Sequence, residues 1–234
     1  MTAIYQREMR SYLTSAVGYV FLAVFYAIAG YYFFATSLVS NSTDLSYVFS
    51  NLFSIVIFLV PMLTMRLFSE ERRQKTEQAL FTAPVSFTGV VMGKFLACLT
   101  MYLLGMGGTL LYFLVMCAFQ IPDVAVFCGN FLGLFLLGAA LCAIGIFISS
   151  LTESQVIAAV GSLAIGLFLL FANSFTPVVS SEWINAVMDG ISFYQHYLDF
   201  TRGLLNLSDL TFFVSVTALF LFLTVRHLER RRIS

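Results

Sequence analysis

The sequence predicts an all-α membrane protein with six transmembrane helices, and two observations support this. Of its 234 residues, 60% are hydrophobic and 10% charged, whereas an average soluble domain is about 45–50% apolar and about 25% charged. Six windows also lack any charged side chain; five are longer than the roughly 20 apolar residues of a membrane span, and the last is shorter. These windows are 11–43, 45–65, 95–122, 124–152, 154–181 and 210–225.

The apolar windows predict the position of each element in chain order. Because the runs are continuous and not alternating, they indicate helices and exclude a membrane β-barrel. The expected spans are 17–36, 48–65, 95–118, 124–148, 155–175 and 210–225. A first segment at 1–16, a second at 66–94 and a third at 176–209 lie outside the bilayer, and none is large enough to form a soluble catalytic domain.

The basic residues predict the orientation. Eleven of the twelve Lys and Arg residues fall on one side of the expected membrane, and only Arg202 falls on the other. The positive-inside rule then places both termini in the cytoplasm of a multi-pass cell-membrane protein. The formal net charge is zero, which gives no basic field for nucleic acid, so we expect no nucleic-acid partner.

The N-terminal segment has the pattern of a short amphipathic helix. Tyr5, Met9, Tyr12, Leu13 and Ala16 recur at helical spacing with polar residues between them. This predicts a helix lying in the inner membrane interface and in contact with lipid. A frayed cytoplasmic tail is the alternative.

The segment between the second and third spans predicts a charged helix over 69–81. Glu71 with Lys75, and Arg73 with Glu77, are spaced i,i+4 and would support it. Two interpretations remain open from charge alone: a helix that docks a partner protein, or a connector whose charges keep it in water.

The exterior segment predicts two short amphipathic helices that enter the membrane partway, one from Trp183 to Ile191 and one from Phe193 to Leu204. His196 lies among their aromatic residues. It has no second His or Cys at ligand spacing, so we interpret it as a hydrogen-bonded interfacial residue and expect no metal site.

Several missing features bear on the mechanism. The expected spans contain no ionisable residue in their interiors, which disfavours a carrier driven by an ion gradient. The only Gly-Lys pair, Gly93–Lys94, lacks the other residues of a phosphate-binding loop, so this chain is not expected to hydrolyse ATP itself. The four cysteines show neither metal-type nor disulfide-type spacing and are expected to be free thiols.

Five stretches in order are similar to a known family. They are REMRSYLTSAVGYVFLAVF, EERRQKTEQALFTAPVSFTGVVMGKFLA, SSLTESQVIAA, ISFYQHYLDFTRGLLNLSDL and the tail RHLERRR. Together they span nearly the whole chain, which resembles the permease subunits of type-2 ABC exporters, most closely the gliding-motility-type branch.

The resemblance implies a prokaryotic ATP-driven exporter in which two permeases, identical or homologous, form the substrate path. Each permease would dock an ATP-binding subunit, which would carry the ATP and Mg²⁺, while this chain would carry no cofactor. The alternatives are a membrane subunit of an envelope or motility machine that moves no solute, then a gradient-driven carrier or channel. The resemblance leaves the substrate open.

The resemblance also implies two sets of functional residues. The residues of the first set would contact the ATPase in the coupling helix and in the turn between the fourth and fifth spans. These are Glu70, Glu71, Arg72, Arg73, Lys75, Glu77, Leu80, Phe81, Thr152, Glu153 and Gln155. The residues of the second set would form an exterior gate, namely Trp183, Phe193, Tyr194, Tyr197 and Phe200.

Overall fold

Every regular element in the described part of the chain is a helix, as the sequence predicts. The computed structural model describes residues 1–234 except 40–43, 77–85, 120–121, 173–189, 205 and 234. In chain order the helices are α1 (Thr2–Thr14), α2 (Ala16–Tyr32), the π-helix η1 (Phe33–Leu38), α3 (Ser46–Thr64), α4 (Ser69–Arg73), α6 (Phe87–Phe119), α7 (Val124–Leu151), α8 (Gln155–Phe171), α10 (Phe193–Thr201) and α11 (Leu207–Ile233).

Five stretches of helix are long and apolar enough to cross a membrane, and they confirm five of the six expected spans. They are Ala16–Leu38, Ser46–Arg73, Phe87–Phe119, Val124–Leu151 and Leu207–Arg231. The sixth, α8, has 17 described residues and is about 25 Å long at 1.5 Å per residue. Its expected end at residue 175 lies outside the described residues, so the count of six stays a prediction.

Helix α6 starts earlier than the sequence predicts. It begins at Phe87, whereas the expected span began at residue 95, after the charged Lys94. The helix continues through Lys94, which is fully buried and forms ion pairs with two carboxylates; where the membrane span begins within this helix stays a prediction. A charge with such partners does not have to mark the end of a helix.

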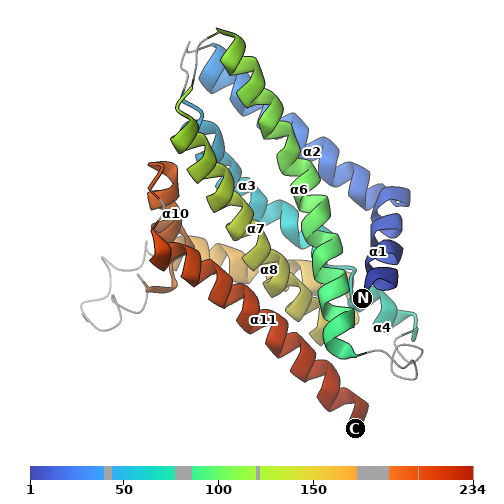
Figure 1. The fold of residues 1–234 in the computed structure, drawn as a ribbon. Helices are drawn as coiled ribbons and strands as arrows, with labels where there is room; N and C mark the ends of the chain where they lie inside the picture. Colours follow the sequence, from blue (N-terminus) through green and yellow to red (C-terminus); the bar gives the residue numbers. More distant parts are fainter. Residues whose placement is uncertain (40–43, 77–85, 120–121, 173–189, 205, 234) are drawn as a thin grey trace.

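Helix α7 lies at the centre of the bundle and contacts α3, α6, α8, α10 and α11 (Figure 1). Small residues allow its neighbours to approach closely. A Cβ at Gly138 would overlap the ring of Tyr102 on α6, and one at Gly145 would overlap the side chain of Thr64 on α3. Most of α7 is buried, whereas α2 and α11 expose much of their apolar surface.

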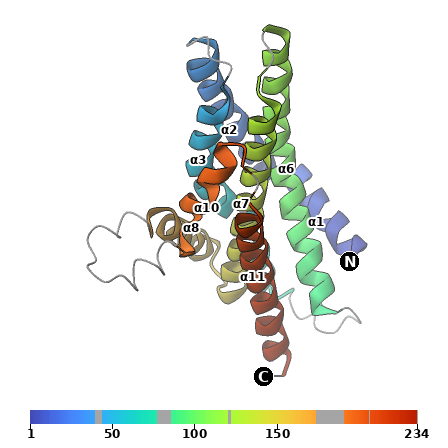
Figure 2. The same cartoon turned by 60° about the vertical axis from the view of Figure 1, so that its left-hand side comes forward.

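The two short helices at opposite ends of the bundle pack against the spans. Ser15 has an extended backbone, so α1 is separate from α2 and turns to run beside α6 (Figure 2). The chain is therefore helical at its N-terminus, and the expected place of this helix in the membrane interface stays a prediction. At the other end, α10 packs against α7, α8, α11 and α3.

Candidate functional site: the α4 junction

The region predicted to couple to a partner is a short helix and the turn before it. We call α4 and the turn 65–68 the α4 junction. The helix predicted over 69–81 ends at Arg73, so the prediction was wrong for residues 74–76, while 77–81 lie outside the described residues. The chain turns there, and Lys75 adopts a left-handed φ of 58°. Its expected i,i+4 partner Glu71 pairs instead with basic residues on α1 and α6, which removes the interaction expected to extend the helix.

A single serine on α7 satisfies the backbone of this turn. The Oγ atom of Ser149 accepts hydrogen bonds from the backbone N–H groups of Phe68, at 3.1 Å, and Ser69, at 3.2 Å. It also donates to the carbonyl oxygen of Met65 at 3.1 Å. Because Ser149 is fully buried, water does not compete for these bonds, and the turn is attached to the end of α7.

Two further carbonyl groups near the end of α3 are bonded by side chains from α1 and α6. The hydroxyl of Tyr12 donates to the carbonyl of Leu63 at 2.7 Å, and burial raises the pKa of Tyr12 well above its usual value, which keeps this donor protonated. The ammonium of Lys94 donates to the carbonyl of Leu67 at 2.5 Å. The carbonyl of Leu63 is one that the end of α3 leaves without an intrahelical partner, and that of Leu67 lies in the turn between α3 and α4.

Four charged side chains from three segments meet at the junction, and we call them the ion cluster: Arg7, Glu8, Glu71 and Lys94. The Lys94 ammonium lies 3.1 Å from a carboxylate oxygen of Glu8 and 3.0 Å from one of Glu71. Arg7 pairs with the same two carboxylates. The formal charges cancel, and the Lys94 side chain is 1% exposed. The ion cluster therefore links α1 and α6 to α4.

The charges of the ion cluster change the pKa of Glu8. Burial alone would raise the pKa of Glu8, but attraction to Lys94 and hydrogen bonds from Arg7 and Lys94 outweigh burial and lower it below its ordinary value. The ion cluster lines a cleft of about 330 Å³. Its charges are already paired with one another, so the arrangement suits a mechanical link between helices better than a ligand site.

The second predicted contact region, the turn between α7 and α8, lies next to α4. The guanidinium of Arg72 forms an ion pair with Glu153 at 3.0 Å and donates to the carbonyl of Leu151 at 2.8 Å. Ser154 caps α8 by accepting a hydrogen bond from the backbone N–H of Ile157. The structure thus brings together two regions that are about 80 residues apart in sequence.

The other residues of the predicted coupling interface are divided between the surface and the interior. Arg73 and Lys75 are exposed. Glu70 is half-buried and pairs with Arg66 at 3.5 Å. Thr152 accepts a hydrogen bond from the backbone of Ser154. The remaining ones are Gln155, which begins α8, and Glu77, Leu80 and Phe81, which lie outside the described residues.

At the opposite end, three of the predicted gate residues are buried between helices. Phe193, Tyr197 and Phe200 of α10 are almost fully inaccessible. The Tyr197 ring lies 4.6 Å from that of Phe53 on α3. Tyr194 is partly exposed, and its ring also contacts Phe53. Trp183 and most of the first predicted exterior helix lie outside the described residues.

The interpretation of His196 as a hydrogen-bonded residue is confirmed. Its Nδ1 atom lies 2.6 Å from a carboxylate oxygen of Asp209, and its ring stacks on Phe212 with centroids 4.0 Å apart. Within the described residues no group of three or more His, Cys, Asp or Glu is arranged to hold a metal. The four cysteines are free thiols.

Comparison with protein families identifies the chain. The model of a family described as "ABC-2 family transporter protein" matches residues 2–226. The chain belongs to the ABC-2 transporter family. None of the curated proteins compared with it matches.

Membership of the ABC-2 family makes this chain a permease, a multi-pass membrane subunit of an ABC transporter that is not itself catalytic. ABC-2 permeases in general work with an ABC ATP-binding partner. A site for such a partner must be reachable from outside the bilayer, and Arg73, where the apolar stretch Ser46–Arg73 ends, is exposed together with Lys75.

The sequence analysis missed the residues that hold the α4 junction of this ABC-2 permease together. The sequence predicts no role for Glu8, places Lys94 at the end of the segment 66–94, and places Ser149 in the turn after the fourth span. The available signal was weak: Lys94 lies within a helical apolar pattern that continues on both sides of it, and such a charge requires a partner.

Proposed function

We propose that this ABC-2 permease is half of an ATP-driven exporter of the gliding-motility-type branch and docks its ATP-binding subunit at the α4 junction. In this proposal the N- and C-termini are cytoplasmic, and a second permease, identical or homologous, completes the path. ATP and Mg²⁺ bind the partner. The observation that carries the proposal is the ion pair between Arg72 and Glu153, which joins the two predicted contact regions into one surface.

The attachments of α4 support a role in passing movement to the spans. A displacement of α4 acts on α7 through Ser149, on α6 through Lys94 and on α1 through Arg7. Buried polar contacts of this kind have narrow distance limits and do not stretch gradually. Closure of two docked ATP-binding subunits would therefore move α1, α6 and α7 together with α4.

The exposed face of the α4 junction favours an acidic docking groove on the partner. Arg73 and Lys75 are exposed, whereas Glu71 is turned toward the buried Lys94. Charge complementarity at such a contact favours the correct partner and speeds association. At the far end, the buried aromatic residues of α10 would close the outer end of the path until the spans move.

The test separates docking from folding. The permease is purified in mild detergent from its native membrane, the ATP-binding subunit that accompanies it is identified, and the complex is reconstituted in nanodiscs. We expect Arg73→Glu to weaken association at least about tenfold, a loss of about 1.4 kcal/mol of binding free energy, and to reduce coupled ATP hydrolysis. Arg230→Glu is the matched control, because Arg230 is an exposed arginine on α11, away from α4.

Two results would refute the proposal. If the permease is purified without any ATP-binding subunit under gentle extraction, the exporter assignment fails. If Arg73→Glu and Arg230→Glu weaken association equally, the α4 junction is not the docking surface. A flux assay with the intact complex then distinguishes an exporter from an envelope machine, because only an exporter moves a solute in proportion to ATP hydrolysed.

A further inference from the structure

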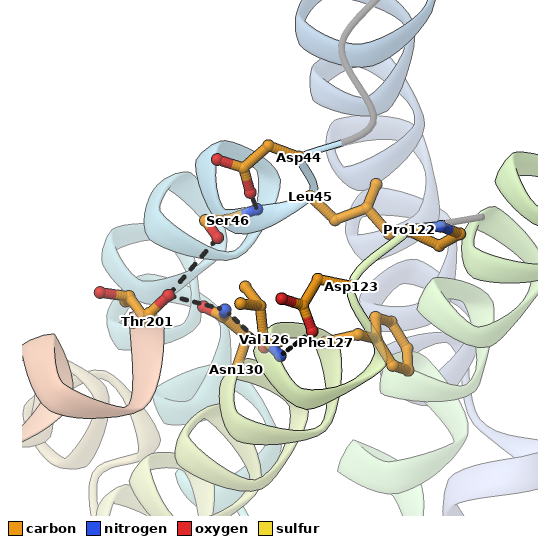
Figure 3. A pocket seen from close by; sticks show the side chains of 9 residues that line it. All are labelled: Asp44, Leu45, Ser46, Pro122, Asp123, Val126, Phe127, Asn130 and Thr201. Atoms are coloured by element: carbon orange, nitrogen blue, oxygen red, sulfur yellow. Dashed lines mark hydrogen bonds between the residues drawn. The ribbon is translucent and has the colours of Figure 1, made fainter. Parts of the chain in front are cut away.

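A polar pocket of about 290 Å³ lies near the start of α3 and α7, at the end of the bundle opposite α4 (Figure 1). Three segments form it: the residues before and at the start of α3, the N-terminal part of α7, and the last residue of α10. Asp123 and Asn130 on α7 face Asp44 and Ser46 across the pocket, with Thr201 at its side (Figure 3). The other lining residues are Leu45, Pro122, Val126 and Phe127.

The polar groups of the pocket are oxygen-rich and its charges are negative. Two carboxylates, from Asp44 and Asp123, line it together with the hydroxyl of Ser46, and none of its nine lining residues is basic. One oxygen of Asp123 accepts the backbone N–H groups of Ala125 and Val126. No hydrogen bond joins its other oxygen to the described residues.

Asn130 provides an independent indication that this pocket suits a ligand. The residue is fully buried, and its Nδ2 atom donates to the carbonyl oxygens of Val126, at 2.8 Å, and Thr201, at 3.3 Å. Because both partners can only accept, they fix which end of the amide is nitrogen. The Oδ1 atom is buried and has no hydrogen-bond partner among the described residues, which is unfavourable for an acceptor unless a donor or cation satisfies it.

We propose that this pocket binds a divalent cation and that the cation is Ca²⁺. Ca²⁺ takes roughly six to eight oxygen ligands from carboxylates, amide and backbone carbonyls and water, in flexible geometry. The pocket offers two carboxylates and an unpartnered amide oxygen, and its volume exceeds that of several waters at about 30 Å³ each. Mg²⁺ requires a smaller and more regular set of six ligands.

The bound cation would fasten the start of α7 to the residues before α3. Asp123 caps α7 and Asn130 belongs to it, whereas Asp44 precedes α3. A cation coordinated by Asp123, Asp44 and Asn130 restricts the movement of these two segments relative to each other. Thr201, the last residue of α10, is held beside them because its carbonyl oxygen accepts a hydrogen bond from Asn130. This site lies apart from the proposed docking surface and does not depend on a partner ATPase, so each proposal can fail without the other.

The experiment measures ⁴⁵Ca²⁺ binding to the purified full-length permease in nanodiscs of neutral phosphatidylcholine, which avoids binding to anionic lipid. We expect one saturable site per chain, weakened at least roughly tenfold by Asp123→Asn and by Asp44→Asn, because affinity depends on the number of charged ligands. Asn at position 123 still caps a helix. Asp199→Asn is the matched control, since Asp199 is on α10 outside the pocket and its loss should not change binding.

A second measurement uses thermal unfolding, with Asn130→Asp as the informative variant. The added carboxylate places a third negative charge in the pocket, so we expect a lower Tm without Ca²⁺ and a larger rise with it than in the unmodified chain. The proposal is overturned if no saturable ⁴⁵Ca²⁺ site exists, or if the two pocket variants bind as the control does. Equal displacement of the label by Mg²⁺ would overturn the choice of Ca²⁺.

Discussion

Replacing Lys94 by methionine tests whether the ion cluster holds the α4 junction together. Methionine is unbranched and replaces the aliphatic part of lysine, so the change mainly removes the ammonium group. The ammonium has three partners in the structure: a carboxylate oxygen of Glu8, one of Glu71, and the carbonyl of Leu67. All three lose their contact at once.

The expected loss of stability follows from the charges that remain in the ion cluster after the substitution. Without Lys94, the carboxylates of Glu8 and Glu71 have side chains only 13% and 15% exposed and share one cation, Arg7, which is 54% exposed. The ion cluster changes from neutral to a formal charge of −1. Removing one partner of a buried ion pair costs roughly 3–5 kcal/mol, a large part of a total stability of about 5–15 kcal/mol.

A double-mutant cycle isolates this interaction. Glu71→Gln alone leaves Lys94 paired with Glu8, and we expect it to cost about 1–3 kcal/mol. The double variant leaves the neutral pair Arg7–Glu8, so its loss should be smaller than the sum of the two single losses by about 1–3 kcal/mol. The free energy of unfolding is measured by titrating the permease in mixed micelles with SDS and following helix content by circular dichroism.

Lys75→Met is the control, because Lys75 is exposed and its loss should change stability by no more than about 0.5 kcal/mol. The reasoning is refuted if Lys94→Met costs as little as this control, or if the two single losses add without coupling. The same geometry makes Glu71→Lys unsuitable as a test of docking, since it places a second ammonium beside Lys94 and damages folding directly.

Three further predictions concern other parts of the fold. Gly138→Ala should cost about 1–3 kcal/mol in the same SDS titration, since its Cβ overlaps Tyr102, whereas Gly107→Ala, with open space around it, should be neutral or slightly stabilising. Ser149→Ala should cost about 1–3 kcal/mol and speed hydrogen exchange at the two amides it accepts; unchanged exchange would count against its role. Glu8, whose pKa is lowered from an ordinary 4.5, should contribute stability at neutral pH that is lost as pH falls below about 4.5 through the lowered pKa. Tm measured from pH 7 to 3.5 should show this loss in the unmodified chain and lack it in Glu8→Gln.

The elements that the sequence predicted well are those that depend on local composition. A run such as 124–148 has no charged residue and is apolar apart from Asn130, so its helix and its place in the membrane follow from the preference of a lipid-embedded backbone for internal hydrogen bonds. The structure confirms it as α7, with an N-terminal cap at Asp123. The helix at the N-terminus follows from periodicity in the same way.

The elements that it predicted poorly depend on contacts between distant residues. The helix expected over 69–81 rested on i,i+4 pairs, but Glu71 finds Arg7, 64 residues away, and Lys94. A tertiary ion pair with a buried partner outweighs a helical pair that contributes only a few tenths of a kcal/mol, about 0.2–0.5. The extension of α6 through Lys94 was not predicted for the same reason, because the neighbours of Lys94 in sequence do not reveal its ion-pair partners.

The partners of the α4 junction are separated along the chain in a way that sets the order of assembly during synthesis. Glu8 and the turn 65–68 leave the ribosome before Lys94, and Ser149 follows some 80 residues after that turn. Until then the amides of the turn lack the acceptor that they have in the finished protein. The first two spans therefore reach their final arrangement only after α6 and α7 have entered the membrane, and a chain truncated before residue 149 would expose its junction to proteolysis and quality control.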